Sequence, residues 1–163
     1  MTTLEDIIRI ATDAHDGQKD MIGDPAIQHV LTVGLMGRNE LEQKAGFLHD
    51  VVEDTGITID DLRSEGVEEE VLEAVDLLTH RDGISYEDYV KRIVSSGNLT
   101  AIHVKLNDLH QNLDRAKRSL SILGAERKGE KALFDRILEI AAIHDWAEMY
   151  IRDAITPGPR PAP

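Results

Sequence analysis

The chain has 163 residues and no cysteine, so we expect a single domain, and disulfides, thiolate nucleophiles and cysteine-ligated zinc are excluded. Its 18 basic and 31 acidic residues give a net charge of −13, which disfavours nucleic acid and anionic membranes as partners. A small phosphorylated substrate is compatible with this charge, because a divalent metal and a few local cations decide its binding.

Apolar residues recur at helical spacing along almost the whole chain, as in the stripe of Leu4, Ile7, Ile8 and Ala11. This periodicity predicts an all-α fold, in which only the run 101–106 is ambiguous between helix and strand. The eight predicted helices cover residues 2–16, 25–37, 39–52, 58–64, 68–79, 85–96, 98–117 and 130–153, with boundaries uncertain by ~2–4 residues.

Residues at the predicted helix ends support this assignment. Thr58 with Asp61 is typical of a capping box, and Ser85 is a suitable N-cap. Residues 118–130 contain two glycines among several charges, which predicts a mobile connection before the last helix. Residues 156–163 contain four prolines and predict a disordered tail, so the folded domain is expected to be 1–155.

The chain start and the hydropathy indicate where the protein resides. The N-terminus lacks a basic region followed by an apolar core, and no apolar run approaches membrane-spanning length. We therefore expect a cytoplasmic protein without a membrane partner. The exposed remainder of the first and last predicted helices could support a homo-oligomer.

Four side chains that can bind a metal or transfer a proton lie in the run from His49 to Asp54. If this run is helical, His49 shares a face with Glu53, and Asp50 shares one with Asp54. Neighbouring carboxylates repel each other unless a cation or a proton lies among them, so the cluster indicates a functional site. In the simpler interpretation, Glu53 and Asp54 cap the following turn or are merely solvated.

Several segments resemble, in order, the motifs of HD-domain metal-dependent phosphohydrolases, and among these the alarmone hydrolases of the RelA/SpoT type. They are residues 15–18, 23–29, 48–55 and 105–108, followed by Asn112. The central run is the most specific of these segments. The resemblance implies a compact HD-domain bundle of about eight helices.

The resemblance also implies roles for individual residues. One divalent metal, usually manganese in these hydrolases, would be bound by His29, His49, Asp50 and Asp108. Glu53 and Asp54 would orient or deprotonate the attacking water. By ligand type alone, two imidazoles and two carboxylates suit manganese, iron or zinc. Taken by itself, a histidine such as His29 is more often packed or at the surface than a ligand.

Substrate contacts are less clearly indicated than the metal ligands. The resemblance places Asn112 in the nucleotide pocket, whereas Asp20 stands where the family has an arginine that stacks on guanine. The candidate phosphate-binding cations, each of which could instead be a surface charge, are Lys19, Arg81, Lys105 and Arg115. His15 is expected to hydrogen-bond the following loop, and a core or surface position is expected for His80, His103, His110 and His144.

Three functional hypotheses follow. The first is a manganese-dependent enzyme that removes pyrophosphate from the 3′ position of a (p)ppGpp-like alarmone. The second is an HD-domain nucleotidase or phosphatase acting on another phosphorylated metabolite, which the aspartate at position 20 favours. The third is a non-enzymatic helical binding domain stabilised by its metal, which the two extra carboxylates at positions 53 and 54 disfavour.

Overall fold

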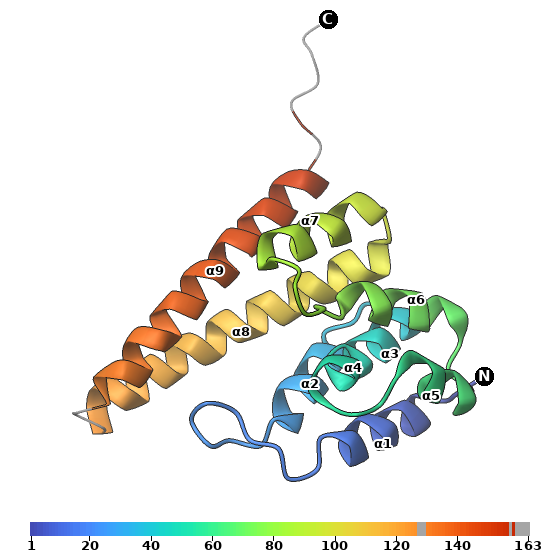
Figure 1. Cartoon of the computed structure of the whole chain (residues 1–163), viewed down its shortest axis with the longest axis horizontal. Helices are drawn as coiled ribbons and strands as arrows, with labels where there is room; N and C mark the ends of the chain where they lie inside the picture. Colours follow the sequence, from blue (N-terminus) through green and yellow to red (C-terminus); the bar gives the residue numbers. More distant parts are fainter. Residues whose placement is uncertain (127–129, 157, 159–163) are drawn as a thin grey trace, which may run out of the picture.

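The computed structural model describes residues 1–126, 130–156 and 158. Within these residues the chain forms helices joined by loops, and the predicted all-α class is confirmed. The ambiguous run 101–106 is helical. In chain order (Figure 1), the helices are α1 (Leu4–Ala14), α2 (Ile27–Leu35), α3 (Glu40–Leu48), α4 (Val51–Asp54), α5 (Ile59–Ser64), α6 (Glu69–Leu78), α7 (Tyr86–Ser96), α8 (Leu99–Glu126) and α9 (Lys131–Ile155).

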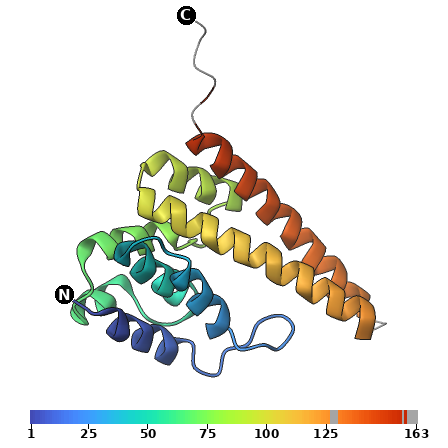
Figure 2. The same cartoon turned by 180° about the vertical axis from the view of Figure 1, so that it is seen from behind.

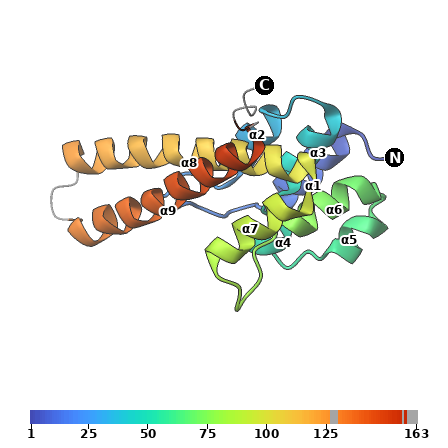
Figure 3. The same cartoon turned by 90° about the horizontal axis from the view of Figure 1, so that it is seen from above.

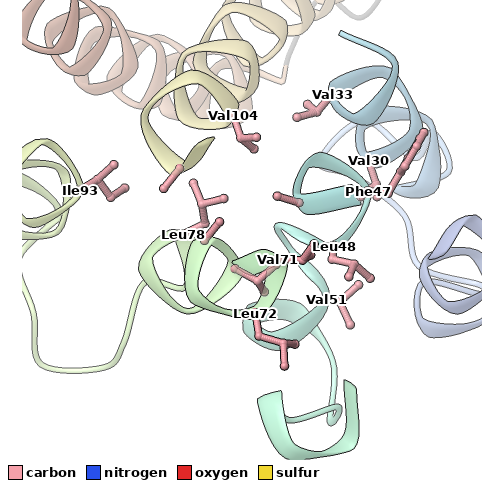
Figure 4. Packing of buried hydrophobic residues seen from close by; sticks show 14 of the residues in the cluster. Val30, Val33, Phe47, Leu48, Val51, Val71, Leu72, Leu78, Ile93 and Val104 are labelled. Atoms are coloured by element: carbon pink, nitrogen blue, oxygen red, sulfur yellow. The ribbon is translucent and has the colours of Figure 1, made fainter. Parts of the chain in front are cut away.

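Helix α3 lies at the centre of the fold and contacts α1, α2, α6 and α8. Figure 4 shows how Val30, Phe47 and Leu48 pack with Val71 and Leu78 to form a continuous apolar core. Phe47 is 2% exposed and Leu48 is fully buried. Because α3 ends at Leu48, this packing also fixes the position of the residues that follow it.

Two glycines allow α2 and α3 to approach closely. A Cβ added at Gly46 would lie 2.9 Å from the Cα of Gly34, and a Cβ added at Gly34 would fall on the ring of Phe47. Real Cβ atoms do not make contacts this short, so only glycine fits at both positions. The close crossing brings His29 of α2 near the C-terminal end of α3.

The predicted helix 39–52 is interrupted at His49 and Asp50, two of the predicted metal ligands. Helix α3 ends at Leu48 and α4 begins at Val51, with His49 and Asp50 forming a turn between them. Both residues keep right-handed helical backbone angles, so the chain makes a tight kink rather than a loop. Leu48 and Val51 are both fully buried, which anchors the two sides of the kink.

Helices α8 and α9 form a long antiparallel hairpin that extends beyond the other helices (Figures 2 and 3). The prediction of a mobile connection over 118–130 is wrong for its first part, because α8 continues to Glu126. A glycine such as Gly124 costs a helix only about 1 kcal/mol, which packing such as that of the buried Leu123 can offset. Residues 127–129 lie outside the described residues.

The capping predictions hold at two helix starts. Thr58 and Asp61 form a capping box at α5, and the Ser85 hydroxyl accepts from the backbone N–H of Asp88 at α7. The predicted tail lies outside the described residues apart from Thr156 and Gly158. Among the described residues, no helix has both the length and the apolar composition needed to span a bilayer.

Candidate metal centre

Four side chains from three parts of the chain meet at one point. They are His29 of α2, His49 and Asp50 of the α3–α4 turn, and Asp108 of α8. His29 Nε2 lies 3.0 Å from Asp108 Oδ1 and 3.2 Å from His49 Nε2. His49 Nε2 lies 3.2 Å from Asp50 Oδ2 and 3.6 Å from Asp108 Oδ1. All four residues predicted as metal ligands are therefore brought together.

Both histidines are held by their other ring nitrogen. His49 Nδ1 donates to the carbonyl oxygen of Gly46 at 2.7 Å, and His29 Nδ1 donates to Oε1 of Gln111. With the proton on Nδ1, each imidazole turns the lone pair of Nε2 toward the other imidazole and the carboxylates. Lone pairs this close repel each other unless a cation or an added proton lies between them, so the donor set fits a divalent metal.

Asp108 is fixed by two donors on its own helix. Lys105 Nζ donates to Oδ2 and Asn112 Nδ2 donates to Oδ1, each at 2.7 Å. Although burial favours the neutral amine, the Asp108 carboxylate keeps the pKa of Lys105 well above its ordinary value. Burial alone would raise the pKa of Asp108, but the ammonium of Lys105 holds it well below its usual range. Asp108 is therefore a permanent anion.

Glu53 and Asp54 of α4 lie next to this cluster. Glu53 Oε1 accepts from the backbone N–H of His80 at 2.6 Å, and among the described residues its second oxygen has no hydrogen-bond partner. Partial burial raises the pKa of Glu53, and the nearby carboxylates of Asp50 and Asp54 raise it further. Partial burial and the charge of Asp50 likewise raise the pKa of Asp54. A carboxylate with a raised pKa is a stronger base, which suits a group that accepts a proton from water.

Two cavities adjoin the four side chains. One, of about 200 Å³, is lined by all four together with Glu53, Asp54 and residues of α8 and α9. The other, of about 480 Å³, lies beneath the α1–α2 loop and shares His29, Asp50 and Asp54 with the first. A small molecule can therefore approach the cluster from either cavity.

The predicted substrate-binding residues differ in position. Asn112 and Arg115 line the smaller cavity, and exposed Lys19 lines the larger one. Lys105 also borders the smaller cavity, but its ammonium is already paired with Asp108 and lies 5.1 Å from the ring centre of Tyr89. Arg81 pairs with Asp76 on the surface and lines neither cavity.

Some residues of the centre were missed by sequence reasoning. Gln111 lies one turn after Asp108, so its helical spacing could have indicated the contact with His29. His144 of α9 and His80 both line the smaller cavity rather than a core or plain surface. No local pattern marks either residue. The contact of His15 with the following loop is confirmed, because its Nδ1 lies 2.8 Å from Gln18 Oε1.

Over the described residues the fold is all-helical and joins a His–Asp doublet to a second histidine and a distant aspartate, as the resemblance to HD-domain phosphohydrolases implies. No family model matches the chain. Its sequence is 31% identical over 140 residues to a GTP pyrophosphokinase of Streptomyces coelicolor, covering 79% of this chain and 16% of that protein. It is 43% identical over 56 residues to a rice (Oryza sativa subsp. japonica) chloroplast protein described as GTP diphosphokinase RSH1, covering 32% of this chain and 6% of the relative.

The fold gives a wider match. A solved structure of a metazoan ortholog of SpoT, described as hydrolysing ppGpp and acting in starvation responses, superposes with a TM-score of 0.59. The match covers 93% of this chain and 92% of that one, at 20% sequence identity. The predicted resemblance to the RelA/SpoT type is thus confirmed in sequence and in fold. The chain spans less than a fifth of the length of the two curated relatives.

Proposed function

We propose that the chain is a metal-dependent phosphohydrolase that removes pyrophosphate from the 3′ position of a (p)ppGpp-like alarmone. The observation that carries the proposal is the convergence of His29, His49, Asp50 and Asp108 beside Glu53 and Asp54. The hydrolysis of ppGpp described for the metazoan SpoT ortholog supports it. The names of the two curated relatives refer to synthesis instead, but those proteins extend far beyond the matched region.

The proposed cofactor is one divalent ion, manganese by the family resemblance, with two imidazole and two carboxylate ligands. When bound, such an ion lowers the pKa of a coordinated water and polarises a phosphoryl oxygen. The Gly46 carbonyl and Gln111 keep the two imidazoles turned toward the ion. Lys105 and Asn112 keep Asp108 ionised and oriented.

In the proposed reaction, Glu53 takes a proton from the attacking water, with Asp54 orienting that water. The water oxygen bonds to the phosphorus attached to the ribose, the bond from that phosphorus to O3′ breaks, and O3′ takes up a proton. The products are pyrophosphate and a nucleotide with a free 3′-hydroxyl. The raised pKa of Glu53 suits this role, because a base works best when its pKa lies near the working pH.

The remaining contacts concern the substrate. We assign Asn112 to the nucleotide and Lys19 and Arg115 to the phosphates, since all three border the cavities next to the centre. Lys105 is bound to Asp108, so its assigned effect on the substrate is electrostatic rather than a direct contact.

A second candidate is a nucleotidase or phosphatase acting on a less highly charged metabolite. Asp20 favours it, because this residue borders the larger cavity at the position where the resemblance expects an arginine that stacks on guanine. The non-enzymatic hypothesis is weaker. A site that only stabilises the fold has no use for the raised pKa of Glu53 and Asp54.

One assay separates these candidates. Manganese-loaded protein is incubated with guanosine and adenosine nucleotides that carry either a 3′-pyrophosphate or a single phosphate, and the released pyrophosphate and orthophosphate are measured. Pyrophosphate from a 3′-pyrophosphate nucleotide supports the alarmone hydrolase, whereas orthophosphate from monophosphates supports the second candidate. If neither product appears while the protein holds its metal, the enzymatic proposal is wrong.

A further inference from the structure

An ion pair joins the α1–α2 loop to α8 across the cavities of the centre. Arg115 Nη2 donates to Asp20 Oδ2 at 3.2 Å, although the two residues are 95 positions apart. The Arg115 side chain is 31% exposed and borders both cavities next to the four proposed ligands. Figure 1 shows the loop between α1 and α2 extending beneath the α8–α9 hairpin.

Asp20 is itself held rigidly by its loop. Its Oδ1 accepts from the backbone N–H groups of Ile22 at 3.0 Å and Asp24 at 2.9 Å, and its own N–H donates to the carbonyl of Asp24 at 2.8 Å. Only Oδ2 therefore faces α8. A carboxylate fixed in this way fixes the guanidinium that it binds, so Asp20 limits the orientations open to Arg115.

Arg115 is one side chain away from a proposed metal ligand. Asn112 Nδ2 donates to Asp108 Oδ1 at 2.7 Å, and Asn112 Oδ1 accepts from Arg115 Nη1 at 3.3 Å. A guanidinium has five N–H donors in one plane, and these two contacts use two of them. The remaining N–H donors are available to a ligand. A pyrophosphate group with one phosphoryl at the metal centre can direct its second phosphoryl toward these N–H donors of Arg115.

The surrounding charge makes such a cation necessary for a diphosphate. Asp50 and Asp54 line the larger cavity and repel a second phosphoryl group, whereas the charge of Asp20 is already paired with Arg115. Arg115 lines that cavity as well. Planar, bidentate donation to a phosphate is the geometry in which arginine is most effective, and a lysine ammonium does not reproduce it.

We infer that Arg115, positioned by Asp20, binds the outer phosphoryl of the substrate and makes the site selective for a pyrophosphate ester over a monophosphate ester. The inference rests on the proposed function and specifies the substrate class of that same site. Arg115 is the binding residue, whereas Asp20 acts only through it.

The test measures kcat/KM for two substrates that share base and ribose and differ only in carrying a 3′-pyrophosphate or a 3′-monophosphate. The selectivity ratio is kcat/KM for the 3′-pyrophosphate divided by kcat/KM for the 3′-monophosphate. In Arg115→Met this ratio should fall about 10- to 100-fold, the size expected for lost charge-assisted hydrogen bonds. Arg115→Lys should fall between wild type and Arg115→Met. Arg136→Met, an exposed arginine of α9 paired with Glu139, is the matched control and should leave the ratio unchanged. An unchanged ratio in Arg115→Met overturns the inference.

Asp20→Asn tests the positioning role. It keeps a side-chain oxygen for the loop but removes the charge that holds the guanidinium, so the ratio should fall by less than in Arg115→Met. The double variant should match Arg115→Met alone, because two residues that act through one contact are not additive. A further fall in the double variant overturns the role of Asp20.

Failure of this inference and failure of the proposed function give different results. If the wild type cleaves neither ester, the proposed function is wrong. Binding then decides the inference, with inorganic pyrophosphate and orthophosphate titrated into manganese-loaded protein. Wild type should prefer pyrophosphate, and Arg115→Met should lose that preference; equal preference in both proteins overturns the inference.

Discussion

The Nε2 atoms of His29 and His49 lie 3.2 Å apart, although neither imidazole has a proton to share if each donates from Nδ1. Asp50 and Asp108 add two carboxylates to the same point. This arrangement is unfavourable without a cation, because like charges and lone pairs repel each other at such distances. The folded chain is therefore expected to depend on its ion.

Removal of the ion should destabilise the protein and abolish hydrolysis. We expect about one divalent ion per chain, a lower midpoint of thermal unfolding with a chelator, and recovery of both properties when manganese is returned. His49→Ala should hold no ion and should not respond to the chelator. His110→Ala, on the exposed side of α8, is the control and should behave as wild type. A wild-type midpoint that ignores the chelator would contradict the metal centre.

Glu53→Gln should separate binding from chemistry. The amide can still accept from the backbone N–H of His80, so the ion should stay bound, but it cannot take a proton. We expect kcat to fall about 10²- to 10⁴-fold. Metal content and single-turnover rates are the measurements, and Glu87→Gln on the surface of α7 is the control. Equal turnover in Glu53→Gln would exclude this carboxylate as the base.

The same base predicts a pH dependence. Glu53 must be deprotonated to act, so kcat/KM should fall as the pH falls through its pKa. Because partial burial and neighbouring carboxylates raise that pKa, the fall should begin at a higher pH than for an ordinary glutamate. A pH profile of kcat/KM with a constant excess of manganese checks this, and an acid limb at the ordinary glutamate value would contradict it.

Gln111→Ala should weaken metal binding although it substitutes none of the four proposed metal ligands. The lost acceptor frees His29 to rotate and to change its tautomer, and loss of such a partner typically lowers metal affinity about 10- to 100-fold. Titration with manganese measures the change. Gln43→Ala is the control, since Gln43 bonds the Gly37 carbonyl away from the centre. Similar affinities for both variants would show that Gln111 does not orient His29.

The α2–α3 crossing predicts different costs for three glycine substitutions. Gly34→Ala forces a methyl group onto the Phe47 ring, and Gly46→Ala places one 2.9 Å from the Gly34 Cα, so each should lower the free energy of unfolding by about 1–3 kcal/mol. Gly56→Ala meets nothing within 4 Å and is the control. Urea unfolding measures all three, and equal stability would mean that the crossing is not tight.

Glu42 predicts acid sensitivity away from the centre. Burial alone would raise its pKa, but hydrogen bonds from Arg38 and His103 lower it to about 2. The unfolded chain therefore takes up this proton first as the pH falls, so the free energy of unfolding should decline between about pH 5 and pH 2. Glu42→Gln should be less stable at pH 7 and show a shallower decline. Urea unfolding at several pH values tests both, and parallel curves would contradict the prediction.

Much of the fold could be predicted locally, because a helix depends on neighbours three and four residues away. The periodicity found the α7 and α9 segments, and the Thr58 and Ser85 caps marked two helix starts correctly. The end of α8 was missed, because Gly124 is tolerated only where a partner helix packs alongside. A local sequence pattern carries no information about which helix packs alongside another in the folded protein.

For the centre, the order of residues along the chain already shows which groups are available: a His–Asp doublet, two nearby carboxylates, and an upstream histidine and a downstream aspartate in a recognisable order. The folded chain was needed to show that the helix breaks between Leu48 and Val51, that Gln111 contacts His29, and that Asp20 pairs with Arg115. The reason is physical. Ligand types follow from side-chain chemistry, whereas contacts across 20 to 95 positions exist only after the core has packed and placed the helices.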